Sequence, residues 1–129
     1  VGIRDYCDEE LDMVHDNPAR MTTFFDKNIK ERQYEGVTWK EICLGIIDKL
    51  PQKVYISFDI DGLDPKLCPN TGTPVPGGFE LDQVFYLFKQ LNASGKEIVG
   101  FDVNEVSAGG NSGEDCFHQF LVGGGAHGR

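Results

Sequence analysis

Apolar positions along the chain follow two spacings, one typical of strands and one typical of helices. Short runs of β-branched and aromatic residues predict strands at 1–3, 22–25, 54–56 and 98–103. Apolar residues three and four positions apart predict helices over 38–50 and 80–91, each with one buried face. A further helix is expected to begin in the acidic stretch 8–12, where negative charges meet the positive end of the helix dipole.

Strands and helices therefore alternate, and this order predicts a three-layer α/β/α fold with a parallel sheet between layers of helices. Thr38 and Glu41 form a capping box, Thr-x-x-Glu, at the start of the helix over 38–50. Ligands of such sheets bind beyond the carboxyl ends of the strands. The candidate functional residues are therefore those that follow the strands at 54–56 and 98–103.

The segment after the first of these strands is rich in carboxylates. It reads Ser-Phe-Asp-Ile-Asp-Gly-Leu-Asp-Pro, with Asp59, Asp61 and Asp64 within six positions. Residues two apart on a strand point the same way, so Asp59 and Asp61 would repel each other unless a hard divalent cation lay between them. We interpret the pair as a metal site, although a lone Asp-x-Asp would favour a helix-capping turn.

A stiff loop follows at 66–79. Three Pro, three Gly and two Thr within fourteen residues exclude a helix or a central strand. The rigidity of this loop and its position beside the carboxylates suit the wall of a ligand pocket, because Gly lets the backbone approach a ligand closely.

Together the two segments resemble the signature of the ureohydrolases, the family of arginase, agmatinase and formimidoylglutamase. The resemblance rests on Ser-Phe-Asp-x-Asp-Gly-Leu-Asp-Pro at 57–65 and Thr-Gly-Thr-Pro-x-x-Gly-Gly at 71–78, and it covers residues 1–108. It implies an arginase-like α/β/α fold, incomplete in this chain. It also implies manganese-dependent hydrolysis of a guanidino substrate such as arginine or agmatine, with release of urea.

The resemblance implies roles for particular residues. Asp59 and Asp61 would be ligands of a pair of Mn²⁺ ions, and Thr73 would contact the substrate. Gly-Phe-Asp-x-x-Glu-Val at 100–106 matches a further family motif, whose Glu, here Glu105, pairs with the guanidinium. Without that match, Glu105 would be interpreted as a solvated loop acid. Asp102, inside an apolar strand, is expected to provide supporting hydrogen bonds.

The rest of the family's site is expected upstream. The remaining metal ligands, in Gly-Gly-x-His and Asp-Ala-His-x-Asp motifs, and the proton-transferring His precede the matched segments in the family. No catalytic residue is therefore expected within this segment. Gly125-Ala126-His127 follows the strands, and we treat its similarity to the first motif as coincidental. The chain is predicted to begin inside a domain and to be the C-terminal part of a ureohydrolase, inactive alone.

Both ends depart from the family pattern. Gly-Ile-Arg-Asp at 2–5 resembles a family segment in which an Asp two residues further on holds the α-amino group of arginine, but Cys7 occupies that position. Arginine, agmatine and other guanidines therefore stay open as substrates. Residues 109–129 are too rich in Gly for the family's closing helix and are expected to be poorly ordered.

Length, net charge and cysteine content limit the number of domains, the partners and the cell compartment. At 129 residues, 40% of them hydrophobic, there is room for one globular domain. The net charge of −9 argues against a nucleic acid or an anionic membrane as partner and is compatible with a cationic substrate. Four dispersed Cys, at 7, 43, 68 and 116, predict free thiols in a reducing compartment, hence a cytoplasmic protein. The resemblance adds a homo-oligomer, and His15 is expected to be exposed.

Three other interpretations stay open. Ile-Ser-Phe-Asp-Ile-Asp-Gly at 56–62 also resembles the opening of haloacid-dehalogenase phosphatases, although Leu63-Asp64 replaces the Thr-apolar pair of that family. The second interpretation is a calcium-binding EF-hand loop that starts at Asp59. Such a loop needs Gly at its sixth position and Glu at its twelfth, where this chain has Asp64 and Asn70, and it is flanked by helices on both sides. A catalytically dead scaffold that keeps the fold is the third.

Overall fold

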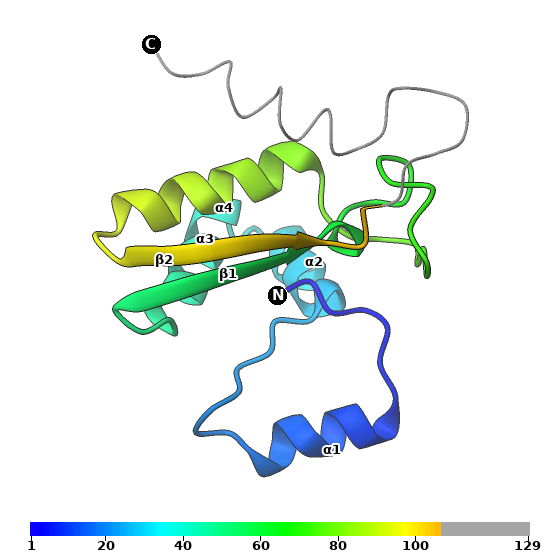
Figure 1. Cartoon of the computed structure of the whole chain (residues 1–129), viewed down its shortest axis with the longest axis horizontal. Helices are drawn as coiled ribbons and strands as arrows, with labels where there is room; N and C mark the ends of the chain where they lie inside the picture. Colours follow the sequence, from blue (N-terminus) through cyan, green and yellow to red (C-terminus); the bar gives the residue numbers. More distant parts are fainter. Residues whose placement is uncertain (107–129) are drawn as a thin grey trace.

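The structure of the protein is a computed structural model that describes residues 1–106. Its elements, in chain order, are α1 (Asp8–Asp16), α2 (Asp26–Tyr34), α3 (Trp39–Asp48), β1 (Lys53–Asp59), the 3₁₀ turn η1 (Ile60–Gly62), α4 (Leu81–Ala93) and β2 (Glu97–Asn104). The two strands run side by side in parallel (Figure 1), with Asp59 opposite Asn104 at their carboxyl ends. The predicted α/β class with a parallel sheet is confirmed.

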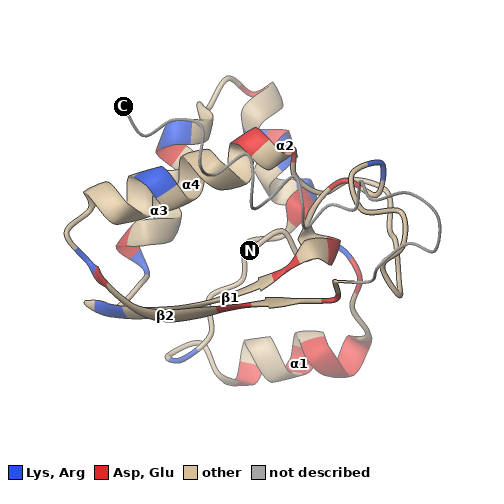
Figure 2. Ribbon diagram, turned by 45° about the horizontal axis from the view of Figure 1, so that its top comes forward, with Lys and Arg blue, Asp and Glu red and all other residues tan. Residues whose placement is uncertain are grey.

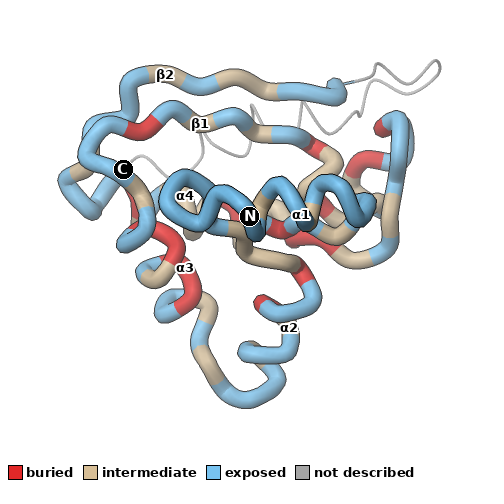
Figure 3. The backbone as a smooth tube through the Cα atoms, turned by 90° about the horizontal axis from the view of Figure 1, so that it is seen from below, coloured by how far each residue is buried: buried red, intermediate tan, exposed pale blue. Residues whose placement is uncertain are grey.

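Two helices, α3 and α4, pack on one face of the sheet (Figure 2). Ile47 of α3 and Leu91 of α4 contact Val54 of β1 in a small buried cluster. Because side chains alternate along a strand, Tyr55 points to the opposite face, where 59% of it is exposed. Helix α1 buries none of its residues (Figure 3), so within residues 1–106 that second face of the sheet is open. Of the two helix layers in the predicted sandwich, the described residues therefore supply one.

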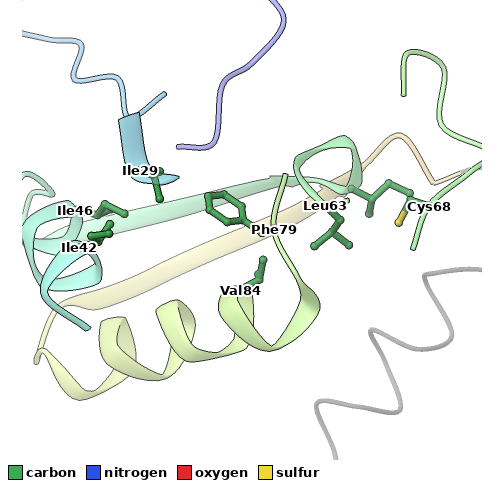
Figure 4. Packing of buried hydrophobic residues seen from close by; sticks show 8 residues of the cluster. Ile29, Ile42, Ile46, Leu63, Cys68, Phe79 and Val84 are labelled. Carbon is green, nitrogen blue, oxygen red and sulfur yellow. The ribbon is translucent and has the colours of Figure 1, made fainter. Parts of the chain in front are cut away.

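The main core lies where α2, α3 and α4 meet the segment that follows β1 (Figure 4). Its least exposed side chains are Ile42 and Leu63, at 0% and 1%. The buried members of this core come from three helices, the segment 60–63 and the loop at 66–79: Ile29, Ile42, Ile46, Ile60, Leu63, Cys68, Phe79 and Val84. The loop is therefore anchored to the core at Cys68 and Phe79.

The helices agree with the sequence prediction except for one that was missed. Helices α3 and α4 lie within two residues of the predicted bounds, and α1 begins in the predicted acidic stretch. In the capping box, the Thr38 hydroxyl accepts from the Glu41 N–H at 3.2 Å, and the Glu41 carboxylate accepts from the Thr38 N–H at 2.8 Å. Helix α2 was not predicted, because Asp26 and Ile29 are its only buried residues and its sequence lacks an apolar stripe.

The predicted strands at 1–3 and 22–25 are wrong as extended elements. They are reduced to one parallel bridge between Ile3 and Phe25. The bridge is held by the Gly2 N–H on the Phe24 carbonyl at 2.7 Å and the Asp26 N–H on the Ile3 carbonyl at 3.0 Å. Pairing stops there because Asp26 already begins α2.

The cysteines correct a second expectation. Cys7 and Cys43 carry free thiols, as predicted, and burial raises the pKa of the Cys43 thiol to about 11. Cys68 is instead disulfide-bonded, so the prediction of four free thiols is wrong. Cys116, His127 and the segment 109–129 lie outside the described residues. None of the helices described in residues 1–106 is long and apolar enough to cross a membrane.

Candidate functional site

The carboxylate turn, residues 59–64, starts where β1 ends. The Asp59 carboxylate accepts the Asp61 backbone N–H at 2.8 Å and thereby caps η1. The helix-capping interpretation is therefore correct for one oxygen of Asp59. The chain leaves the strand after Asp59, so the alternation that was expected to align Asp59 with Asp61 does not extend to Asp61. The 3₁₀ turn brings the two residues to the edge of one cavity instead.

Asp61 holds the most informative atom of the turn. Its Oδ2 accepts a hydrogen bond from the Thr73 hydroxyl at 3.3 Å. Its Oδ1 is buried and has no hydrogen-bond partner among the described residues. An unpaired buried acceptor costs about 1–3 kcal/mol, and more when it is charged. An oxygen in this condition is suited to a cation as partner, and a carboxylate is a hard ligand of the kind that Mn²⁺ and Mg²⁺ take.

The loop at 66–79 folds back onto the carboxylate turn. Leu63 and Phe79 form a parallel bridge, with the Asp64 N–H on the Phe79 carbonyl at 2.9 Å and the Phe79 N–H on the Gly62 carbonyl at 3.0 Å. Gly78 is required for this approach: its φ is +87°, and an added Cβ would lie 2.6 Å from the Leu63 carbonyl oxygen. The loop contains no helix or longer strand, as predicted, and its residues Thr73, Val75 and Phe79 line a cavity beside β1.

Glu105 lies directly after β2 with an unusual backbone. Its φ of +59° is the single positive value among the described non-glycine residues. Such a conformation is costly for a residue with a side chain, and it occurs preferentially at functional sites. A Cβ on Gly72 would lie 3.4 Å from the Glu105 carboxylate, and the neighbouring Thr73 contacts Asp61. The loop thus connects Glu105 with Asp61, residues from the ends of different strands.

Asp59, Asp61, Thr73 and Glu105 form a rim at the carboxyl ends of the two strands. Asp102 lies within β2 and takes no part in it. Its carboxylate accepts hydrogen bonds from Ser57 at 2.8 Å, Tyr55 at 3.0 Å and Asn104 at 2.6 Å. The Ser57 hydroxyl, followed by that of Tyr55, lowers the pKa of Asp102, and the bond to Asp102 raises the pKa of Tyr55. This is the supporting hydrogen-bond role that the sequence predicted, and it fastens β1 to β2 beside the rim.

A cavity of about 560 Å³ opens along β1. Apolar side chains of α3, β1 and α4 line one part of it, and Asp59, Asp61 and Thr73 line the part at the carboxyl end of β1. Acidic residues mark the ends of both strands (red in Figure 2). Two further lining residues, Arg4 and Asp5, received no role from the sequence. Arg4 donates to the Asp61 carbonyl in the carboxylate turn and to the Val75 carbonyl in the loop at 66–79. No local sequence pattern reveals these contacts.

The carboxylates of the rim are candidate metal ligands. Among residues 1–106, no three or more His, Cys, Asp and Glu side chains are grouped so as to hold a metal ion. Asp59 and Asp61 offer carboxylate oxygens, and Oδ1 of Asp61, which has no partner in the described part of the chain, fits a cation. The donor set therefore fits a hard divalent ion but needs ligands from outside the described residues.

Comparison with known proteins shows the family. The sequence profile of the Arginase family matches residues 1–114, so the chain belongs to the arginase family. It is 42% identical over 106 residues to an N(1)-aminopropylagmatine ureohydrolase of Thermococcus kodakarensis, covering 82% of this chain and 33% of that protein. It is 46% identical over 65 residues to the enzyme of the same name from Thermus thermophilus, covering 50% and 22%.

Solved structures support the same fold. An arginase from Bacillus caldovelox superposes with a TM-score of 0.75 at 19% identity, over 99% of this chain and 42% of that one. The chain spans between about a fifth and a third of the length of the two curated relatives. The arginase-like α/β fold, incomplete in this chain, is therefore confirmed, as is membership of a family of ureohydrolases.

Proposed function

We propose that the chain is the C-terminal part, over 1–108, of a manganese-dependent ureohydrolase that hydrolyses a guanidino substrate and releases urea. The observation that carries the proposal is the rim at the carboxyl ends of β1 and β2. There Asp61, whose buried Oδ1 has no hydrogen-bond partner among the described residues, contacts Thr73, and Glu105 lies against Gly72 of the same loop. Family membership supports the proposed reaction class, and the geometry of the rim supports the proposed residues.

Asp59 and Asp61 would hold the metal. Both are carboxylates at the edge of one cavity, and a pair of Mn²⁺ ions is the cofactor proposed for the complete site. Two bound divalent cations lower the pKa of water toward neutrality and orient it for attack. Because the described residues supply only these two ligands, we propose that this chain alone is inactive and contains no catalytic residue.

Glu105 and Thr73 would bind the substrate. A carboxylate can accept two parallel hydrogen bonds from a planar guanidinium, and its charge offsets the repulsion between that cation and the metal ions. The left-handed backbone of Glu105 directs its carboxylate toward Gly72 of the loop, next to Thr73. The loop that contacts Asp61 would therefore also orient the substrate.

The identity of the guanidine is open among arginine, agmatine and their derivatives. Cys7, where the family pattern has an Asp for the arginine α-amino group, is exposed and starts α1 by donating its N–H to Glu10 at 2.8 Å. The two relatives above are named for an agmatine derivative. Both observations favour a substrate without an α-amino group.

Other properties belong to the same proposal. We propose a homo-oligomer for the complete protein, and neither nucleic acid nor membrane as partner, given the net charge of −9. We also propose a cytoplasmic location. The disulfide at Cys68 removes part of the cysteine argument for that location, which rests on the remaining free thiols and on the class of enzyme.

The test uses the complete protein, meaning this chain together with its proposed upstream part. With Mn²⁺ present, it should release urea from arginine or agmatine, and the 129-residue chain alone should release none. Release of inorganic phosphate from a phosphomonoester would favour the phosphatase alternative. Absence of both activities, with retained fold by circular dichroism, would leave the dead scaffold.

A further inference from the structure

Arg4 makes the longest-range side-chain contacts at the rim. Its Nη2 donates to the Asp61 carbonyl at 2.6 Å and to the Leu63 carbonyl at 3.0 Å. Its Nε donates to the Val75 carbonyl at 3.0 Å. These bonds join residues 57 to 71 positions apart in the sequence. One side chain from the N-terminal segment therefore holds both the carboxylate turn and the loop at 66–79.

The geometry is that of a clamp and not of an ion pair. All three acceptors are backbone carbonyls, and the rigid, planar fork of a guanidinium suits several acceptors in fixed directions. The clamped residues flank the contact between the Asp61 carboxylate and the Thr73 hydroxyl, since Asp61 is itself clamped and Val75 lies two residues after Thr73. The position of the Asp61 side chain thus depends on a residue that does not touch its carboxylate.

A second cation offers a matched comparison. Lys30 of α2 donates to the Gly78 carbonyl at 3.0 Å and pairs with Asp26, a residue only 6% exposed. Like Arg4, it fixes a backbone carbonyl of the loop at 66–79. Unlike Arg4, it makes no bond to the carboxylate turn within residues 1–106, so its loss should loosen one end of the loop only.

We propose that Arg4 is a positioning residue, which fixes Asp61 and the loop relative to each other so that the metal ligand and the substrate-binding wall keep their arrangement. The part of this proposal that concerns metal binding rests on the proposed function. The change in Mn²⁺ affinity expected on loss of Arg4 is opposite in sign to that of a simple charge effect. Removing a positive charge near a cation site would tighten Mn²⁺ binding by electrostatics alone, whereas loss of a positioning residue weakens it.

The first experiment needs no metal. Amide hydrogen exchange is measured on the 129-residue chain and its Arg4→Lys, Arg4→Met and Lys30→Met variants, below their unfolding transitions. Loss of the fork should speed exchange at 60–64 and 73–79 together by at least about tenfold, the factor expected from about 1.4 kcal/mol. Lys30→Met should affect only the segment around Gly78. Exchange that rises in one segment alone in the Arg4 variants would overturn the clamp.

The second experiment measures Mn²⁺ affinity in the complete protein by equilibrium dialysis with elemental analysis. Both Arg4 variants should bind Mn²⁺ at least about tenfold more weakly, although Arg4→Lys keeps the charge, and Lys30→Met should bind it as the parent does. Unchanged or tighter binding in Arg4→Met would overturn the positioning role. The two proposals fail separately, because a parent protein that binds no Mn²⁺ contradicts the proposed function while hydrogen exchange still decides the clamp.

Discussion

Asp61 Oδ1, which is buried and has no hydrogen-bond partner within residues 1–106, leads to a prediction with opposite signs for stability and metal binding. In Asp61→Asn, the side-chain oxygen can keep the bond from Thr73, and the negative charge that Oδ1 shares is removed. Leaving a buried polar group unpaired costs about 1–3 kcal/mol. Since the new amide is itself only partly satisfied, we expect the metal-free protein to gain about 1 kcal/mol in free energy of unfolding. For a chain of this size that raises the melting temperature by roughly 2–8 °C.

The assay is thermal unfolding in EDTA and in Mn²⁺. In EDTA, the 129-residue chain carrying Asp61→Asn should unfold at a higher temperature than the parent chain. In the complete protein, Mn²⁺ should raise the melting temperature of the parent, because a ligand that binds only the folded state stabilises it. The same addition should leave Asp61→Asn unchanged. A variant that is destabilised in EDTA and still stabilised by Mn²⁺ would refute the reasoning, since Asp61 would then be an ordinary structural residue.

Three further predictions concern the rim, the loop at 66–79 and the pairing of β1 with β2. Asp59→Ala in the complete protein should abolish stoichiometric Mn²⁺ by elemental analysis, and an unchanged metal content would remove Asp59 from the ligand set. Gly78→Ala should lower the free energy of unfolding by more than about 1 kcal/mol, measured by urea denaturation, because its Cβ would strike the Leu63 carbonyl at positive φ; a neutral effect would contradict the packing of the loop. Hydrogen bonds that lower the pKa of Asp102 stabilise the fold above the pKa of the unfolded carboxyl, and this stability is lost as the pH falls through the folded pKa. Ser57→Ala should therefore raise the pKa of Asp102 toward its ordinary value in an NMR titration, and an unmoved pKa would exclude Ser57 as the main cause.

Local patterns were sufficient for the elements whose burial is regular. The helices over 39–48 and 81–93 show apolar spacing of three and four, and the strand at 53–59 is marked by its apolar run. Helix α2 was not predictable in this way, because Ile29 is its single buried apolar residue. Its buried Asp26 pairs with Lys30 of the same helix, and Lys30 in turn donates to the distant Gly78 carbonyl. The short segments around Ile3 and Phe25 read as strands by composition, yet they share a single bridge.

In the site, too, local sequence patterns indicated the candidate residues but not the features that depend on distant contacts. The sequence singled out Asp59, Asp61, Thr73 and Glu105 as candidates, but it assumed a continuing strand where a 3₁₀ turn places Asp61. The positive φ of Glu105 has no signal in the sequence, because it arises from how the chain leaves β2 beside the loop. The three carbonyl contacts of Arg4 were also invisible, since each joins segments more than fifty positions apart.

We propose that the carboxylate turn holds metal while Glu105 binds the guanidinium. The measurement that tests it most directly is Glu105→Gln in the complete protein, with bound manganese and urea-release kinetics determined on the same sample. Gln keeps the shape and deletes the charge, and an uncompensated buried cation costs roughly 3–5 kcal/mol. We therefore expect kcat/KM for arginine or agmatine to fall by about a hundredfold or more while the manganese content stays at the parent value. Parent-like kinetics, or loss of manganese together with activity, would contradict this division of roles between the two strand ends.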